Sequence, residues 1–115
     1  ILRVAGTDLA NIRSGTINEA IEAGDQIVQE IMRDGAKFLG IALAGTVNLL
    51  APDIIILGGG LVEAMPRLYI DEVAKSLAKH VMPSYQKTYE LKAAKLGDDA
   101  GAMGAAAWAR RLIEA

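Results

Sequence analysis

The stretch DIIILGGGLVEAMP, residues 53–66, decides the fold of this chain. Its residues Ile54–Leu57 form a short apolar run without polar alternation, which is typical of a strand covered on both faces in a parallel sheet. Three glycines, Gly58, Gly59 and Gly60, follow the run directly, and Pro66 suits the first turn of a helix. The stretch therefore predicts a buried strand, a glycine turn and a helix, in that order.

The glycine turn is the candidate ligand site of the chain. A parallel strand that enters a helix through such a turn leaves backbone N–H groups free at a corner that attracts anions. Glycine lacks a Cβ, so its backbone can approach a ligand closely and can take a positive φ. Ligands of open α/β sheets also bind beyond the carboxyl ends of the strands. Gly58, Gly59 and Gly60 are thus candidate nucleotide-binding residues, and a tight turn without a ligand is the alternative.

Two common nucleotide motifs do not fit this turn. The dinucleotide fingerprint needs glycine at its first, third and sixth positions, but counting from Gly58 the sixth position is Glu63, and counting from Gly59 the third is Leu61. The phosphate loop of many ATPases needs Gly-Lys-Ser/Thr, which the chain does not contain. A third pattern fits, which consists of an apolar strand, two glycines, four to six further residues and a proline at a helix start. It resembles the adenosine motif of the sugar kinase, actin and heat-shock ATPase superfamily.

The residues before the strand predict helices. Residues 14–22 predict a short helix that Ser14 or Thr16 caps and Gly24 ends. Asp25 is expected to cap the next helix, whose apolar residues recur at helical spacing.

Gly35 is expected to separate that helix from a further one over residues 36–50. This further helix is apolar nearly all round, so we expect it to be buried between a sheet and other helices, and Pro52 ends it.

Three elements are predicted after the glycine turn. A helix runs from Pro66 to about Met82, and a strand with one solvent-exposed face covers residues 88–94. An alanine-rich helix then follows a cap at Asp98–Asp99. The two strands and the helix between them form a parallel βαβ unit. A central strand such as Ile54–Leu57 needs a neighbour on each side, and the chain supplies one. The missing neighbour is expected to come from the remainder of a longer parent chain or from another copy pairing at strand 54–57.

The bulk composition limits the possible functions. The 115 residues are 52% hydrophobic and 23% charged with a net charge of −2, which suits one globular domain and gives no basic stripe for nucleic acid. No cysteine is present, so disulfides and thiolate metal sites are excluded within the chain. The most apolar stretch, residues 38–52, is too short for a membrane span and predicts a core helix.

Four separated segments resemble one known family. These are AGD before a helix (23–25), the LG-A-A---NLL-P pattern within 39–52, the strand ending in LGGG (57–60), and LGDDAGAMGAA (96–106). Their order and spacing over about residues 17–109 resemble the C-terminal half of the ROK family, which contains bacterial glucokinases, other hexose kinases and sugar-responsive repressors. The resemblance implies an α/β fold that is the C-terminal part of an actin-like (ribonuclease H-like) ATPase lobe, with a partial parallel sheet and flanking helices. Residues 1–115 would then be a single partial domain of a two-lobed protein.

The resemblance also implies roles for particular residues. Gly58–Gly60 match the family's nucleotide-facing loop for ATP with Mg²⁺. The segment 23–25 lies near the adenine region in similar folds, although a plain helix cap is the favoured role for Asp25. Gly101 and Gly104 match a final helix whose small residues pack near the hinge between the lobes, and packing alone would also explain them.

Other parts of the family pattern are missing from the chain. Such kinases use a catalytic aspartate, an N-terminal phosphate loop and a Glu-Gly-His segment that holds the sugar, and many carry a cysteine-rich zinc site. None of these is here, so the chain is expected to hold no catalytic residue and no metal ligand, and to be inactive alone. His80 is expected at the surface, Asp98–Asp99 are expected to be helix-start charges, and Tyr69 and Trp108 are expected in a core or an interface.

Two functions from different classes follow. The first is the nucleotide-side lobe of a cytoplasmic, homo-oligomeric sugar kinase that phosphorylates a hexose. The alternative is the sugar-sensing lobe of a transcriptional repressor, the only case in which nucleic acid would be a partner; a scaffold piece without a ligand is a more remote rival. The intact LGGG favours the kinase, and neither function involves a membrane.

Overall fold

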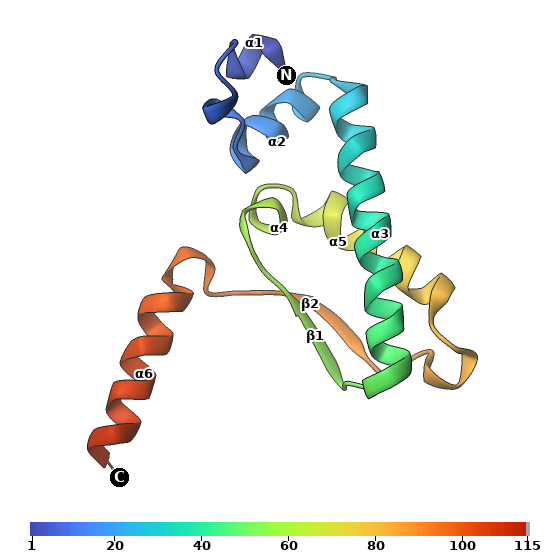
Figure 1. The fold of residues 1–115 in the computed structure, drawn as a ribbon, viewed down its shortest axis with the longest axis vertical. Coiled ribbons are helices and arrows are strands. Elements are labelled where there is room, and N and C mark those ends of the chain that lie inside the picture. The colour runs from blue at the N-terminus through green and yellow to red at the C-terminus, as the bar shows by residue number, and fades with distance from the viewer. Residues whose placement is uncertain (115) are drawn as a thin grey trace.

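The computed structural model describes residues 1–114, whose elements run α1, α2, α3, β1, α4, α5, β2 and α6 along the chain (Figure 1). Their bounds are α1 Leu2–Ala5, α2 Ser14–Glu22, α3 Gln26–Leu50, β1 Ile54–Leu57, α4 Gly60–Ala64, α5 Pro66–His80, β2 Glu90–Ala93 and α6 Ala100–Glu114. Short 3₁₀ turns lie at Leu9–Asn11, Pro83–Tyr85 and Gly97–Asp99.

The two strands form a parallel pair, as the sequence predicts. Ile54 lies opposite Glu90 and Leu57 opposite Ala93. The Ala94 amide donates to the Leu57 carbonyl at 2.7 Å, which continues the ladder to the point where the glycines begin. The second strand is shorter than the predicted 88–94, and the first has its predicted bounds.

Helices α3 and α5 pack against each other and against one face of the sheet. Ala44, Val47, Leu77 and Val81 form the core cluster, and Ile55 of β1 packs on it. The two helices approach so closely at Gly40 that a Cβ there would lie 2.6 Å from Ser76 Cβ and 2.7 Å from the Val73 carbonyl oxygen.

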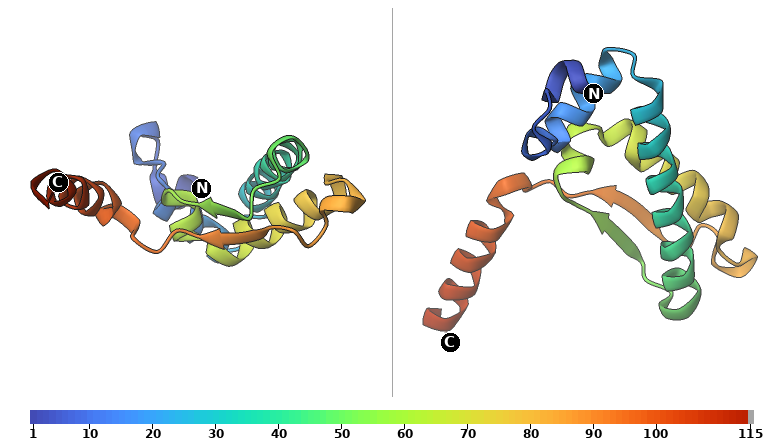
Figure 2. Two further views of the ribbon diagram at one scale, coloured as in Figure 1. Left: turned by 90° about the horizontal axis from the view of Figure 1, so that it is seen from below. Right: turned by 45° about the horizontal axis from the view of Figure 1, so that its top comes forward.

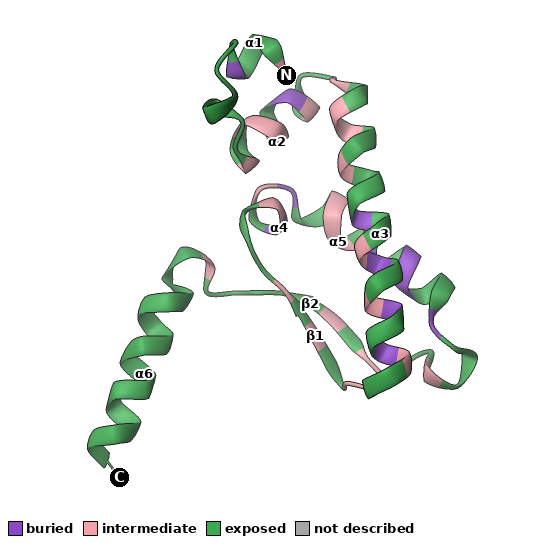
Figure 3. Ribbon diagram, viewed as in Figure 1, coloured by how far each residue is buried: buried purple, intermediate pink, exposed green. Residues whose placement is uncertain are grey.

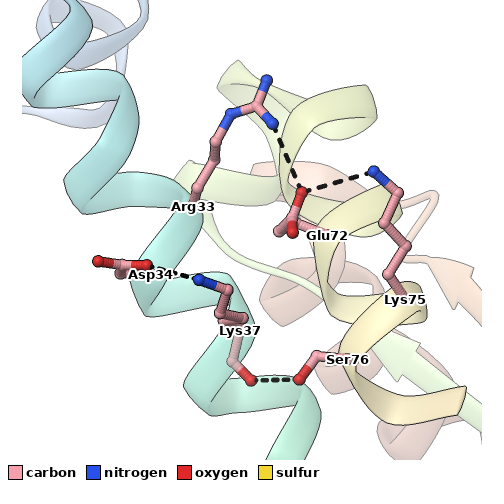
Figure 4. Close-up of polar contacts among 6 residues, drawn as sticks. All are labelled: Arg33, Asp34, Lys37, Glu72, Lys75 and Ser76. Atoms are coloured by element: carbon pink, nitrogen blue, oxygen red, sulfur yellow. Dashed lines mark hydrogen bonds and ion pairs between the residues drawn. The ribbon is translucent and has the colours of Figure 1, made fainter. Parts of the chain in front are cut away.

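Polar contacts fix the same pair of helices (Figure 4). The Ser76 hydroxyl donates to the Lys37 carbonyl at 2.7 Å. Glu72 of α5 lies 3.6 Å from Arg33 of α3 and 3.7 Å from Lys75. These ion pairs are partly exposed and contribute little stability, so close packing stabilises the contact between the two helices more than the ion pairs do.

The expected break at Gly35 is wrong, because α3 runs unbroken from Gln26 to Leu50. A glycine inside a helix costs only about 1 kcal/mol relative to alanine, and packing against α5 outweighs that cost. The Asp25 cap is confirmed, since its carboxylate accepts from the Val28 amide. At the other end Ala51 takes a left-handed conformation with φ 45°.

Burial differs from the sequence expectation in two places (Figure 3). Strand β1 is covered on one face only, since Ile56 is 62% exposed while Ile55 packs on the core. Helix α3 is likewise buried on one side only, since Leu49 is 82% exposed. The expectations of a strand covered on both faces and of a helix buried nearly all round are therefore wrong for the described residues, whose packing covers one face of each element.

The glycine turn also contains a helix that the sequence did not predict. Helix α4 begins at Gly60, before Pro66 starts α5 as expected. So short a helix leaves no periodic signal in the sequence, because one turn of helix carries no repeat.

Helix α6 stands away from the rest of the molecule (Figures 1 and 2). Every residue of α6 is exposed, including Trp108 at 63% and Ile113 at 86%. Trp108 therefore lies in no core within the described chain. Asp98 and Asp99 lie in the 3₁₀ turn that precedes α6. None of the helices described here combines the length and the hydropathy needed to cross a membrane.

Candidate nucleotide-binding site

The glycine loop follows β1 at the carboxyl end of the sheet. Gly59 has φ 106° and ψ 164°, a backbone conformation that is essentially restricted to glycine. The strand therefore turns away from the sheet at Gly59, and α4 begins one residue later. The sequence of the loop thus determines its backbone path.

Gly58 and Gly60 are close to other segments. A Cβ on Gly58 would lie 3.2 Å from Ala94 Cβ, just beyond β2, and a Cβ on Gly60 would lie 2.8 Å from the Ser14 hydroxyl oxygen at the start of α2. Packing thus accounts for part of the glycine requirement. It also brings residues 14, 58–60 and 94 together at one corner.

The amide groups of the loop are open. Among the described residues, the amides of Gly58, Gly59 and Gly60 donate no hydrogen bond to another backbone group, while the Gly59 carbonyl accepts from the Glu63 amide at 3.1 Å. Backbone N–H groups usually find a partner, so three consecutive open donors are available to an oxygen-rich ligand.

A cavity of about 260 Å³ adjoins the loop. Besides the three glycines, its walls are Leu57, Leu61, Val62, Leu39 of α3 and Tyr69 of α5. Pockets for drug-sized ligands measure about 300–1,000 Å³, so this cavity has the size of part of such a site. Its apolar walls beside open amides suit a ligand with a flat apolar end and an anionic end.

The segment 23–25 does not line this cavity. Asp25 Oδ1 accepts from the Val28 amide at 3.1 Å, and Oδ2 contacts the N-terminal ammonium of Ile1. The ammonium and then the Val28 amide hold the pKa of Asp25 below its usual value. The favoured role of Asp25 as a helix cap is confirmed.

The other sequence candidates lie apart from the loop. His80 is exposed, and its Nδ1 donates to the Ser76 carbonyl at 2.7 Å. Gly101 and Gly104 face open space on α6. Within residues 1–114 no three His, Asp or Glu side chains gather in a way that could hold a metal ion.

Three residues at the corner escaped the sequence interpretation. Ser14 was expected only as a helix cap, Tyr69 only as a core or interface aromatic, and Leu39 only as part of an apolar helix. They reach the loop from three different helices, so no local pattern in the sequence could group them.

The fold is that of the C-terminal part of an actin-like ATPase lobe. It superposes on the crystal structure of a ROK family glucokinase from Streptomyces griseus, in complex with glucose and AMPPNP, with a TM-score of 0.80 and 30% identity. The match covers 96% of this chain and 35% of that structure.

The sequence profile of the ROK family matches residues 1–112, so the chain belongs to the ROK family. The glucokinase of Thermotoga maritima is 34% identical over 95 residues, which are 83% of this chain and 30% of that enzyme. The N-acetyl-D-glucosamine kinase of Mannheimia succiniciproducens is 36% identical over 91 residues, 79% of this chain and 29% of that enzyme. The chain thus spans less than a third of the length of these two relatives.

Proposed function

We propose that this chain is the nucleotide-side lobe of a ROK sugar kinase, and that Gly58, Gly59 and Gly60 hold ATP. The main support is the likeness to the Streptomyces griseus glucokinase, which was crystallised with AMPPNP, an ATP analogue. The open amides and the adjoining cavity fit the phosphates and the base of such a nucleotide. No feature of the chain favours the repressor alternative.

The proposed reaction transfers the terminal phosphoryl group of ATP to a hydroxyl of a hexose or an N-acetylhexosamine. Such transfer depends on positioning and on electrostatic stabilisation of the phosphates, and the loop amides would contribute to both. The catalytic base and the sugar-binding groups would come from the rest of the parent protein, so the lobe is proposed to be inactive alone. The proposal includes a cytoplasmic location, where ATP is available, and a homo-oligomeric parent.

Magnesium would reach this site with the nucleotide. Mg²⁺ in kinases is commonly held by substrate phosphates and one or two carboxylates. The proposal therefore places Mg²⁺ on the phosphates of the bound nucleotide in the full-length parent and assigns it no ligand among residues 1–114.

The substitution Gly59→Val in the full-length protein tests the proposal. A branched side chain at φ 106° forces the loop to a new path, so we expect the KM for ATP to rise about tenfold or more while the KM for the sugar changes little. Steady-state kinetics with each substrate varied in turn measure both constants.

Gly45→Val is the matched control. Gly45 lies on α3 with nothing near its Cβ position, so both KM values should stay at the wild-type level. An unchanged KM for ATP in Gly59→Val would remove the nucleotide role from the loop.

A further inference from the structure

Ser14 lies against the glycine loop although it belongs to a distant part of the sequence. A Cβ on Gly60 would lie 2.8 Å from Ser14 Oγ and 3.3 Å from Ser14 Cβ. The serine side chain thus occupies the space that a side chain at residue 60 would fill. Glycine at this position lets the hydroxyl stand directly beside the loop.

The Ser14 hydroxyl has no structural partner. Helix α2 has Arg13 as its N-cap residue and no side-chain cap, so Ser14 does not perform the capping role expected from its sequence. The neighbouring Thr16 hydroxyl donates to the Asn11 carbonyl at 2.8 Å, and the Ser76 hydroxyl donates to Lys37. No such bond is found for Ser14 among residues 1–114, so its hydroxyl is free beside Gly60, the last residue of the glycine loop.

We propose that Ser14 is a nucleotide-binding residue whose hydroxyl donates a hydrogen bond to a phosphate oxygen of the nucleotide at Gly58–Gly60. This inference rests on the proposed function. A hydroxyl and backbone amides all donate, and their shared target is an anionic oxygen. The corner therefore draws its donors from two segments, α2 and the glycine loop, and a nucleotide would link them.

The substitution Ser14→Ala in the full-length protein tests the inference. Loss of a hydrogen bond to a charged group should raise the KM for ATP about tenfold while the KM for the sugar stays unchanged. Ser14→Thr keeps the hydroxyl and should keep the wild-type KM for ATP. Thr16→Val removes a hydroxyl from the same helix that bonds only to the chain, so it should change neither KM.

Binding measurements separate the phosphate from the rest of the nucleotide. In titration calorimetry, Ser14→Ala should weaken ADP binding about tenfold and leave adenosine binding unchanged. Equal losses for ADP and adenosine would overturn the phosphate assignment, and so would a rise of both KM values together, which indicates a structural role.

Gly59→Val distinguishes this inference from the function on which it rests. If Gly59→Val raises the KM for ATP and Ser14→Ala does not, the role of Ser14 is wrong and the kinase proposal stands. If neither variant changes that KM, both are wrong.

Discussion

Each of the three consecutive glycines of the loop is required for a different structural reason. Gly59 is needed for its backbone conformation, Gly58 for the approach of Ala94, and Gly60 for the approach of Ser14. The costs of substitution should differ accordingly. A side chain at Gly59 is strained in every surrounding, whereas one at Gly60 could be accommodated if Ser14 rotates away. The loop therefore has a packing role beside its proposed ligand role, and the KM for ATP of the substituted protein separates the two.

The contribution of Asp25 to stability can be tested by lowering the pH. The folded pKa of Asp25 lies below its ordinary value, so the charged carboxylate contributes stability above that ordinary value, and the contribution is lost as the pH falls through the folded pKa. Asn is as good a cap as Asp but cannot titrate. We therefore expect the melting temperature of Asp25→Asn to fall less than that of the wild type as the pH is lowered from 5 to 2, roughly the range over which an aspartate titrates.

Circular dichroism melts at several pH values measure this effect. Asp71→Asn is the control for the loss of one acidic side chain, since Asp71 is exposed on α5 and forms no ion pair among residues 1–114. Parallel profiles for the wild type and Asp25→Asn would show that the charge of Asp25 contributes no stability to the folded chain.

At the scale of elements, the contact between α3 and α5 carries the core. Two of the three glycines of α3, Gly35 and Gly40, allow a matched comparison, since both would gain helix propensity on change to alanine. Gly35→Ala meets no neighbour and should stabilise the chain by about 1 kcal/mol. Gly40→Ala would press on the Val73 carbonyl and the Leu77 amide, so it should destabilise by about 1–3 kcal/mol.

Urea unfolding of Gly35→Ala and Gly40→Ala measures the change in the free energy of unfolding for each variant. The atoms that Gly40→Ala would meet belong to the backbone and to Ser76 Cβ, so no side-chain rotation relieves the contact. Equal stabilisation by both substitutions would mean that the helices can separate at Gly40 without cost.

The elements show where sequence reasoning succeeds. Strand β1, the Pro66 helix start and the Asp25 cap were predicted because each depends on residues within one short segment. The parallel pairing was predicted from the order strand, helix, strand. The unbroken α3 was not predicted, because packing against α5 outweighs the local signal of Gly35. The glycine loop was found by its pattern, whereas Ser14, Leu39 and Tyr69 were not, because only the folded chain brings them to it.

The whole molecule is less compact than a typical domain of the same length. Its radius of gyration is 17.3 Å, whereas a compact domain of 115 residues has about 13 Å. It is also flat, with extents of 53 × 43 × 18 Å (Figure 2). A chain of this shape leaves much of its apolar surface without a neighbour. The outer edge of β1 and the whole of α6 are the clearest examples.

We therefore expect the chain, expressed alone, to self-associate or to be poorly soluble, with the free edge of β1 as one point of pairing. An unpaired apolar strand edge is a template for another strand, and a single charge on it opposes such pairing. Ile56→Lys should raise the monomer fraction, and Leu112→Lys on α6 tests the other exposed surface in the same way. Light scattering coupled to size-exclusion chromatography measures the mass of each species. A wild-type chain that stays monomeric at high concentration would show that these surfaces tolerate water, and association unchanged by Ile56→Lys would place the contact away from β1.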